Sequence, residues 1–136
     1  MLALILTAFA MATQTPAAPL DVDIPQVANV TQDPTCGGRE ALATQAFCLM
    51  TTQVAAESVV TTFTEAFQAQ GWIAADGRDN LVIYVKRKPE GGCTAFQMVA
   101  FADDRRPAAP GSPAYLALAS IPGDICRSQG GATAPQ

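Results

Sequence analysis

The sequence predicts an α+β domain in which a helical N-terminal half, residues 39–70, packs on an antiparallel meander of three or four strands, residues 72–121. Two observations predict this: an apolar stripe with a period of 3.6 residues before Trp72, and a period of two residues after it. A chain of 136 residues accommodates one domain with a workable core. Hydrophobic residues make up 49% of it and charged residues 15%, which is typical of a folded protein.

The clearest element is an amphipathic helix within residues 52–72. Its apolar positions follow the spacing of a single helix face: Ala56, Val59, Val60, Phe63, Ala66 and Phe67. Gly71 follows these residues and can adopt the left-handed conformation that ends a helix. Trp72 would then fold back onto Phe67. We therefore expect this helix to press one face onto the sheet.

Residues 39–50 also show helical spacing, through Leu42, Ala46, Leu49 and Met50. This spacing is in phase with the later stripe, so residues 39–70 form either one long helix or two helices broken near residues 50–52. Residues 13–32 are expected to be a flexible or extended lead-in. The short apolar alternation at residues 20–24 could also form a small edge strand, because Pro25 either ends it or confines it to a sheet edge. The folded domain is then residues 33–128.

Strands are expected at residues 81–88, 93–101 and 115–121, with a shorter one at 72–74. A turn at 89–92 puts the first two strands in a register whose helix-facing side holds Leu81, Ile83, Val85, Phe96, Met98 and Ala100. The second side then holds Val82, Tyr84, Lys86, Lys88, Ala95, Gln97, Val99 and Phe101. Because this side is mixed instead of polar, we expect residues 20–30, a second copy of the chain or a partner to cover part of it.

The N-terminus and the cysteines both indicate export. Apart from Thr7, residues 2–12 are apolar, but the run is too short to cross a bilayer, and Ala10-Met11-Ala12 has the small-x-small form of a signal-peptide cleavage site. The basic region that usually precedes such a run is missing, so the true start could lie upstream; the alternative is a core segment. Residues 129–136 read as a disordered tail.

Four cysteines without a CxxC pair predict two disulfides in a periplasmic or secreted protein. We favour Cys93–Cys126, because the expected hairpins place Cys93 opposite about position 123. The other pair is then Cys36–Cys48, which requires the chain to fold back sharply at Gly37-Gly38. These two glycines allow such a reversal.

The composition lowers the odds of several function classes. A net charge of −4 argues against a nucleic-acid partner. Histidine is absent, which removes the commonest general base and metal ligand. Ser58 and Ser112 have neither a GxSxG context nor a histidine partner. We therefore expect no catalysis, no cofactor, no metal and, in the mature chain, no stable membrane span.

Two groups of residues are weak candidates for binding: a basic strand end and the arginines of the 103–113 loop. The residues are Tyr84, Lys86, Arg87, Lys88, Arg105 and Arg106. Both groups also have ordinary explanations, as a charged strand end that discourages edge pairing and as a solvated loop tip.

The leading functional hypothesis is a non-catalytic binding or interaction module. Its partner would be a protein, an envelope component or a second copy held on the second sheet face. An inhibitor of a secreted hydrolase that presents the 103–113 loop is the alternative. A carboxylate-dependent enzyme ranks third.

Overall fold

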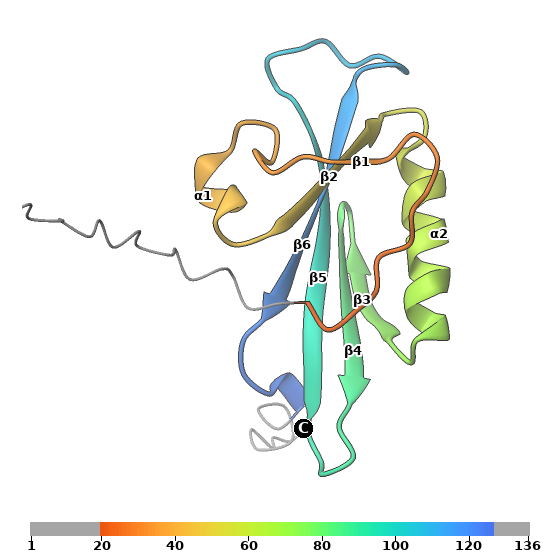
Figure 1. The fold of residues 1–136 in the computed structure, drawn as a ribbon, viewed down its shortest axis with the longest axis vertical. Helices are drawn as coiled ribbons and strands as arrows, with labels where there is room; N and C mark the ends of the chain where they lie inside the picture. Colours follow the sequence, from red (N-terminus) through yellow and green to blue (C-terminus); the bar gives the residue numbers. More distant parts are fainter. Residues whose placement is uncertain (1–19, 127–136) are drawn as a thin grey trace, which may run out of the picture.

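The computed structural model describes residues 20–126 and contains one six-stranded antiparallel sheet in the order β1-β2-β6-β5-β4-β3 (Figure 1). The elements in chain order are β1 (Thr31–Gln32), α1 (Glu40–Ala43), β2 (Phe47–Thr52), α2 (Ala56–Ala69), β3 (Ile73–Arg78), β4 (Leu81–Arg87), β5 (Cys93–Ala102) and β6 (Pro113–Ile121). The expected signal peptide and the 129–136 tail lie outside the described residues. Within residues 20–126, neither helix is long and apolar enough to span a membrane.

The prediction of a helical half on a three- or four-stranded meander is wrong. Helix and antiparallel sheet are both present, but residues 39–70 hold only the four-residue α1 and the α2 helix, with β2 between them. β2 lies inside the sheet, next to β6, and its consecutive residues Cys48 and Leu49 are both buried. A strand buried on both faces shows no period of two residues, so its apolar positions can match helical spacing by coincidence.

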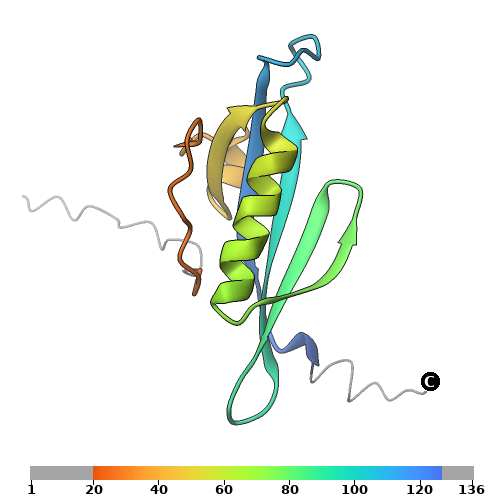
Figure 2. The ribbon, with the colours of Figure 1, turned by 90° about the vertical axis from the view of Figure 1, so that its right-hand side faces the viewer.

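The α2 helix follows its sequence pattern. Val59, Phe63 and Phe67 are its buried residues. It ends in a Schellman motif, in which Gly71 has φ +95°, its N–H donates to Gln68 and the N–H of Trp72 donates to the Phe67 carbonyl at 3.0 Å. The helix lies along one face of the sheet (Figure 2).

An aromatic cluster joins α2 to the sheet. The Phe67 ring meets the rings of Tyr84 and Phe96 edge-on, at centroid distances of 5.1 and 5.2 Å. Trp72 packs edge-on against Phe96 at 4.7 Å. All four side chains are at most 3% exposed, so this cluster is the centre of the core.

The register expected for β4 was off by one residue. Val82 pairs with Met98 and Tyr84 with Phe96, which puts Val82 and Tyr84 on the α2 side in place of Leu81, Ile83 and Val85. The connection is the five residues 88–92, closed by a hydrogen bond from the Lys88 N–H to the Gly92 carbonyl at 2.9 Å. A shift of one residue exchanges the two faces of a strand.

Residues 20–30 cover the α2 side of the sheet, and not the second face. Five apolar residues of this lead-in pack against the core around Phe67: Leu20, Val22, Ile24, Val27 and Val30. The Gln70 side chain at the end of α2 also bonds the backbone N–H and carbonyl of Asp23, both at 2.8 Å. The lead-in is therefore packed against the domain.

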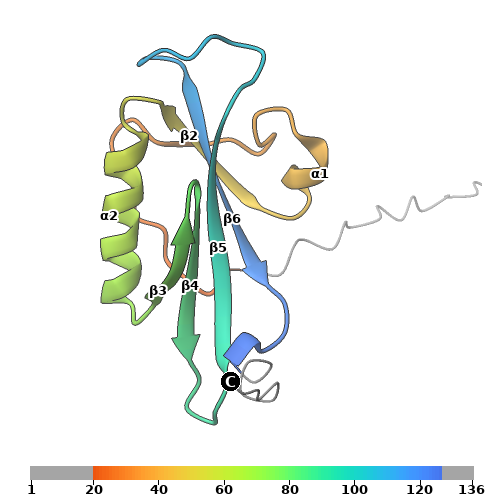
Figure 3. The same cartoon turned by 180° about the vertical axis from the view of Figure 1, so that it is seen from behind.

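The second face is covered only in part. Figures 1 and 3 show α1 and α2 on opposite sides of the sheet. Near α1, a small cluster of Cys36, Cys48 and Ala117 is buried. Elsewhere the register brings a row of apolar residues onto this face, at Ile73, Val85, Ala95 and Ile121. Ile73 is 58% exposed.

Both disulfides join the pairs favoured from the sequence. Cys36–Cys48 and Cys93–Cys126 have Cα–Cα distances of 5.2 and 5.4 Å. The reversal before α1 uses three consecutive left-handed residues, with φ +52° at Cys36, +67° at Gly37 and +82° at Gly38. The Asp33 carboxylate holds this turn by accepting hydrogen bonds from the N–H groups of Thr35 and Gly37.

Replacing Phe67 with alanine should lower the free energy of unfolding by about 3–5 kcal/mol, because it opens a cavity among three other rings. Urea denaturation followed by far-ultraviolet circular dichroism measures this. The control is Gln68→Ala on the exposed side of α2, with an expected change below about 0.5 kcal/mol. A loss below about 1 kcal/mol for Phe67→Ala would contradict the central place of this cluster.

Candidate functional site

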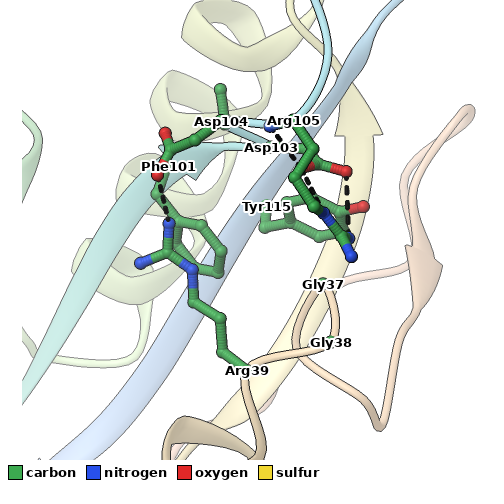
Figure 4. A pocket seen from close by; sticks show the side chains of 9 residues that line it. Gly37, Gly38, Arg39, Phe101, Asp103, Asp104, Arg105 and Tyr115 are labelled. Atoms are coloured by element: carbon green, nitrogen blue, oxygen red, sulfur yellow. Dashed lines mark hydrogen bonds and ion pairs between the residues drawn. The ribbon is translucent and has the colours of Figure 1, made fainter.

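A hollow of about 330 Å³ lies where the turn before α1 meets the end of β5 and the start of β6 (Figure 4). It is on the second face of the sheet, beside the start of the 103–113 loop. Its lining consists of Gly37, Gly38, Arg39, Phe101, Ala102, Asp103, Asp104, Arg105 and Tyr115.

Two aromatic rings form its apolar surface. Phe101 and Tyr115 are direct partners in the β5–β6 register, and their rings stack at a centroid distance of 5.2 Å. Gly37 lies directly against the Tyr115 ring, since a Cβ atom there would meet it at 3.0 Å. The turn therefore approaches the rings closely only because residue 37 is glycine with a positive φ.

The Arg39 guanidinium is held over the face of Phe101, 4.3 Å from the ring centroid. A guanidinium in this position gains a cation–π interaction and keeps its edge free for hydrogen bonds. Its ion-pair partner is the Asp104 carboxylate at 3.6 Å, whose side chain is 91% exposed. An ion pair this exposed contributes about 0–1 kcal/mol, so another carboxylate can replace Asp104 at little cost.

Arg105 is engaged within its own loop. The Asp103 carboxylate accepts hydrogen bonds from the Arg105 backbone N–H at 3.0 Å and from its Nε and Nη2 at 2.9 and 3.2 Å. Arg106 lies 3.8 Å from the same carboxylate. The hydrogen bonds from Arg105 lower the pKa of Asp103, so this group stays ionised at neutral pH and is not a proton donor there. Figure 4 shows Arg39 beside Phe101 and Arg105 beside Tyr115.

The other candidate residues lie elsewhere. Arg87 ends β4 opposite Cys93 at the start of β5, whereas Arg105 follows the end of β5. Ten residues of extended strand separate the two groups by about 30 Å. Lys86 lies over the Trp72 ring, with Nζ 5.7 Å from the centroid. The basic strand end and the loop arginines are therefore two separate surfaces.

Tyr84 is a core residue. Its side chain is 0% exposed, and its hydroxyl lies 2.6 Å from Thr64 Oγ1 of α2. Burial raises the pKa of this phenol, because the charged form loses its hydration. A ligand on the protein surface does not reach it.

The hollow owes its cation and its rings to Arg39, Phe101 and Tyr115, and none of these three was a candidate from the sequence. They come from separate segments, and only the reversal at Cys36–Gly38 brings Arg39 onto the sheet. No local pattern around Arg39 indicates this. The glycine pair before it was the available signal, since it allowed the fold-back that the Cys36–Cys48 pairing required.

One group of three potential metal ligands occurs within residues 20–126, at Cys93, Asp124 and Cys126, with ligand atoms within 4.8 Å of one another. Its two sulfur atoms are joined in a disulfide, which leaves no thiolate to bind a metal. Asp124 accepts a hydrogen bond from the Cys93 N–H at 2.9 Å. This group fastens the chain after β6 to the start of β5.

Comparison with protein-family models, with curated proteins and with solved structures finds no match to this chain.

Replacing Asp103 with asparagine should remove a pH-dependent contribution to stability. Because the folded state lowers the pKa of Asp103, its contribution is fully present above the ordinary pKa of 3.8 and is lost as the pH falls through the lower folded value. The difference in unfolding free energy between wild type and Asp103→Asn should therefore shrink below about pH 4. Urea titrations between pH 7 and pH 2 measure it.

Asp104→Asn is the matched control, because this neighbouring carboxylate is 91% exposed and makes one long ion pair. Its effect on unfolding should be negligible at every pH. A difference between wild type and Asp103→Asn that stays constant down to pH 2 would contradict the assigned role of Asp103.

Proposed function

We propose that this protein is a non-catalytic binding module of an extracytoplasmic compartment, and that it holds an acidic group of a protein or envelope partner beside Arg39. One observation carries the proposal. The Arg39 guanidinium is positioned over Phe101, while its ion-pair partner Asp104 is almost fully exposed at 3.6 Å. The hollow thus offers a preorganised cation whose carboxylate partner is easily exchanged.

Charge and shape around the hollow support a carboxylate ligand. Three arginines, at 39, 105 and 106, surround two carboxylates, those of Asp103 and Asp104. The local balance is therefore one positive charge on a chain whose net charge is −4. The stacked Phe101 and Tyr115 rings beside the guanidinium suit a flat apolar body attached to the carboxylate.

The absence of catalysis is part of the proposal. The chain has no histidine, and the two carboxylates that line the hollow are both paired with arginines. Ionised, paired carboxylates bind cations or position a loop, but they are poor acids and bases near neutral pH. These features favour recognition over chemistry.

The two disulfides support an extracytoplasmic compartment, because reducing pools keep most cytosolic thiols free. The apolar row across the second face, at Ile73, Val85, Ala95 and Ile121, offers a partner additional contact area on the same side of the sheet as the hollow. Self-association through this face stays a prediction.

A hydrolase inhibitor is the second candidate, and the anchoring of the 103–113 loop favours it. The Ser112 hydroxyl donates to the Pro107 carbonyl, and the N–H of Val54 donates to the Pro110 carbonyl. Such a loop loses little entropy on binding. It ranks second because Arg105 and Arg106 are both paired with Asp103 of the same loop. Loss of hydrolase inhibition after deletion of the loop would support this candidate.

Benzoate is a direct probe of the hollow, because it combines a carboxylate with a flat apolar ring. A titration followed by ¹⁵N–¹H spectra should shift the amide signals of Gly37, Gly38 and Arg39. Arg39→Gln should weaken the binding about tenfold or more, as expected for loss of a charged hydrogen-bond donor. Benzyl alcohol, which lacks the charge, should bind no better to wild type than to Arg39→Gln.

Arg78→Gln is the matched control, because Arg78 is an exposed arginine of β3 with a similar long ion pair, 3.8 Å from Asp76. It should bind benzoate as wild type does. The proposal fails if Arg39→Gln binds benzoate with wild-type affinity, or if the shifts gather at other residues.

The compartment has its own test. Protein recovered from its own cells should give two disulfide-linked peptide pairs in a non-reducing peptide map, Cys36 with Cys48 and Cys93 with Cys126. Its N-terminus should begin after Ala12. Free thiols together with an uncut leader would contradict export and leave the hollow itself untouched.

A further inference from the structure

A second hollow lies on the α2 side of the sheet, between the first turns of α2 and the tip of the β3–β4 hairpin, and we propose that it binds a small organic ammonium ligand with an apolar body. It is distinct from the hollow beside Arg39 and Phe101 described above (the Arg39 hollow), and it selects a ligand of the opposite charge. Its volume is about 280 Å³. Its lining consists of Ala56, Glu57, Val60, Thr61, Asp79, Asn80, Val82, Met98 and Ala100.

The floor of this hollow is apolar. Val60 of α2, Val82 of β4, and Met98 and Ala100 of β5 form it, and Met98 is 2% exposed. The tip of the β3–β4 hairpin diverges from α2 (Figure 2), so the helix does not cover this part of the sheet. A ligand with an apolar body would remove the remaining exposed side-chain surface from water.

The rim is acidic, and its β3–β4 side is held in place by hydrogen bonds. Glu57 lies in the first turn of α2, and Asp79 and Asn80 form the β3–β4 turn. The Asn80 side chain donates to the Ala100 carbonyl at 2.7 Å, and the Ala100 N–H donates to the Asn80 carbonyl at 2.9 Å. These two bonds clamp the turn to β5. This side of the rim is therefore preorganised for a ligand.

The charge of the rim selects a cation. Two carboxylates and no lysine or arginine line the hollow. Among residues 20–126, none of the ion pairs involves Glu57 or Asp79. Taken separately, each residue has a structural explanation. An acidic residue such as Glu57 stabilises the N-terminus of a helix, and aspartate is common in turns such as the one at Asp79. Both residues line the same apolar floor, Glu57 from α2 and Asp79 from the β3–β4 turn, and their charges favour a cation there over an anion.

The size of the hollow limits the ligand to a small molecule. A volume of about 280 Å³ is at the lower end of the range for ligand pockets. It suits a single ring or a short branched chain carrying one amine. The occupant we infer is therefore an aryl- or alkylammonium ion.

Three isosteres separate the contributions of charge and apolar surface: 2-phenylethylammonium, 3-phenylpropionate and 2-phenylethanol. Titrations of the full chain followed by ¹³C–¹H methyl spectra should shift Val60, Val82 and Met98 with the ammonium probe. We expect it to bind about tenfold more tightly than the alcohol, and the carboxylate not to bind in this hollow. Raising the salt concentration should weaken the ammonium complex but not the alcohol complex.

Two variants test the residues. Glu57→Gln combined with Asp79→Asn should reduce the affinity for 2-phenylethylammonium to that for 2-phenylethanol. Ala56→Leu keeps a strong helix former at the start of α2 and fills the hollow, so it should abolish binding of both probes. Glu65→Gln, an exposed position of α2 outside the lining, should bind the ammonium as wild type does.

The proposal is overturned if the ammonium and the alcohol bind equally to wild type, or if the double variant keeps wild-type affinity. It is also overturned if the shifts fall at Gly37 and Arg39 instead of Val60 and Val82. Far-ultraviolet circular dichroism of each variant shows that it is folded before titration. Failure here leaves the benzoate experiment at Arg39 unaffected, because that experiment follows a different probe and different residues.

Discussion

Phe96 is the side chain on which the arrangement of the elements depends. Its ring contacts those of Phe67 from α2, Trp72 from the helix stop and Tyr84 from β4, so one residue of β5 fixes a helix, its end and the neighbouring strand together. Edge-to-face and stacked contacts of this kind have narrow geometric preferences. They determine where α2 lies on the sheet, and therefore which part of the sheet stays uncovered.

The second face is organised by covalent bonds instead of a large core. The Cys36–Cys48 disulfide ties the turn before α1 to β2, and only a few small side chains are buried beneath it. A domain of this size gains a useful part of its stability from such cross-links. The same bond places Arg39 above Phe101, so that one constraint both covers the sheet and builds the hollow.

Sequence periodicity predicted α2, because a helix buried on one face has apolar residues at a regular spacing of 3.6 residues. The glycine at position 71 predicted where it ends. Periodicity missed β2, which is buried on both faces and loses its alternation. It also shifted the register between β4 and β5 by one residue. The connection spans residues 88–92 instead of the expected 89–92, and no residue type indicates the Lys88–Gly92 hydrogen bond that closes it. The Arg39 hollow depends on a reversal of the chain, and no local pattern beyond the Gly37-Gly38 pair indicates that Arg39 lies beside Phe101.

Ala100 and Phe101 are neighbours on β5, and alternation along the strand directs one into each hollow. The two cavities are thus back to back, separated by the thickness of a single peptide chain. A ligand that displaced this shared peptide in one hollow would change the affinity of the other hollow for its own ligand. By thermodynamic reciprocity the coupling free energy would be the same whichever ligand bound first, and two ligands that leave the peptide in place would bind independently.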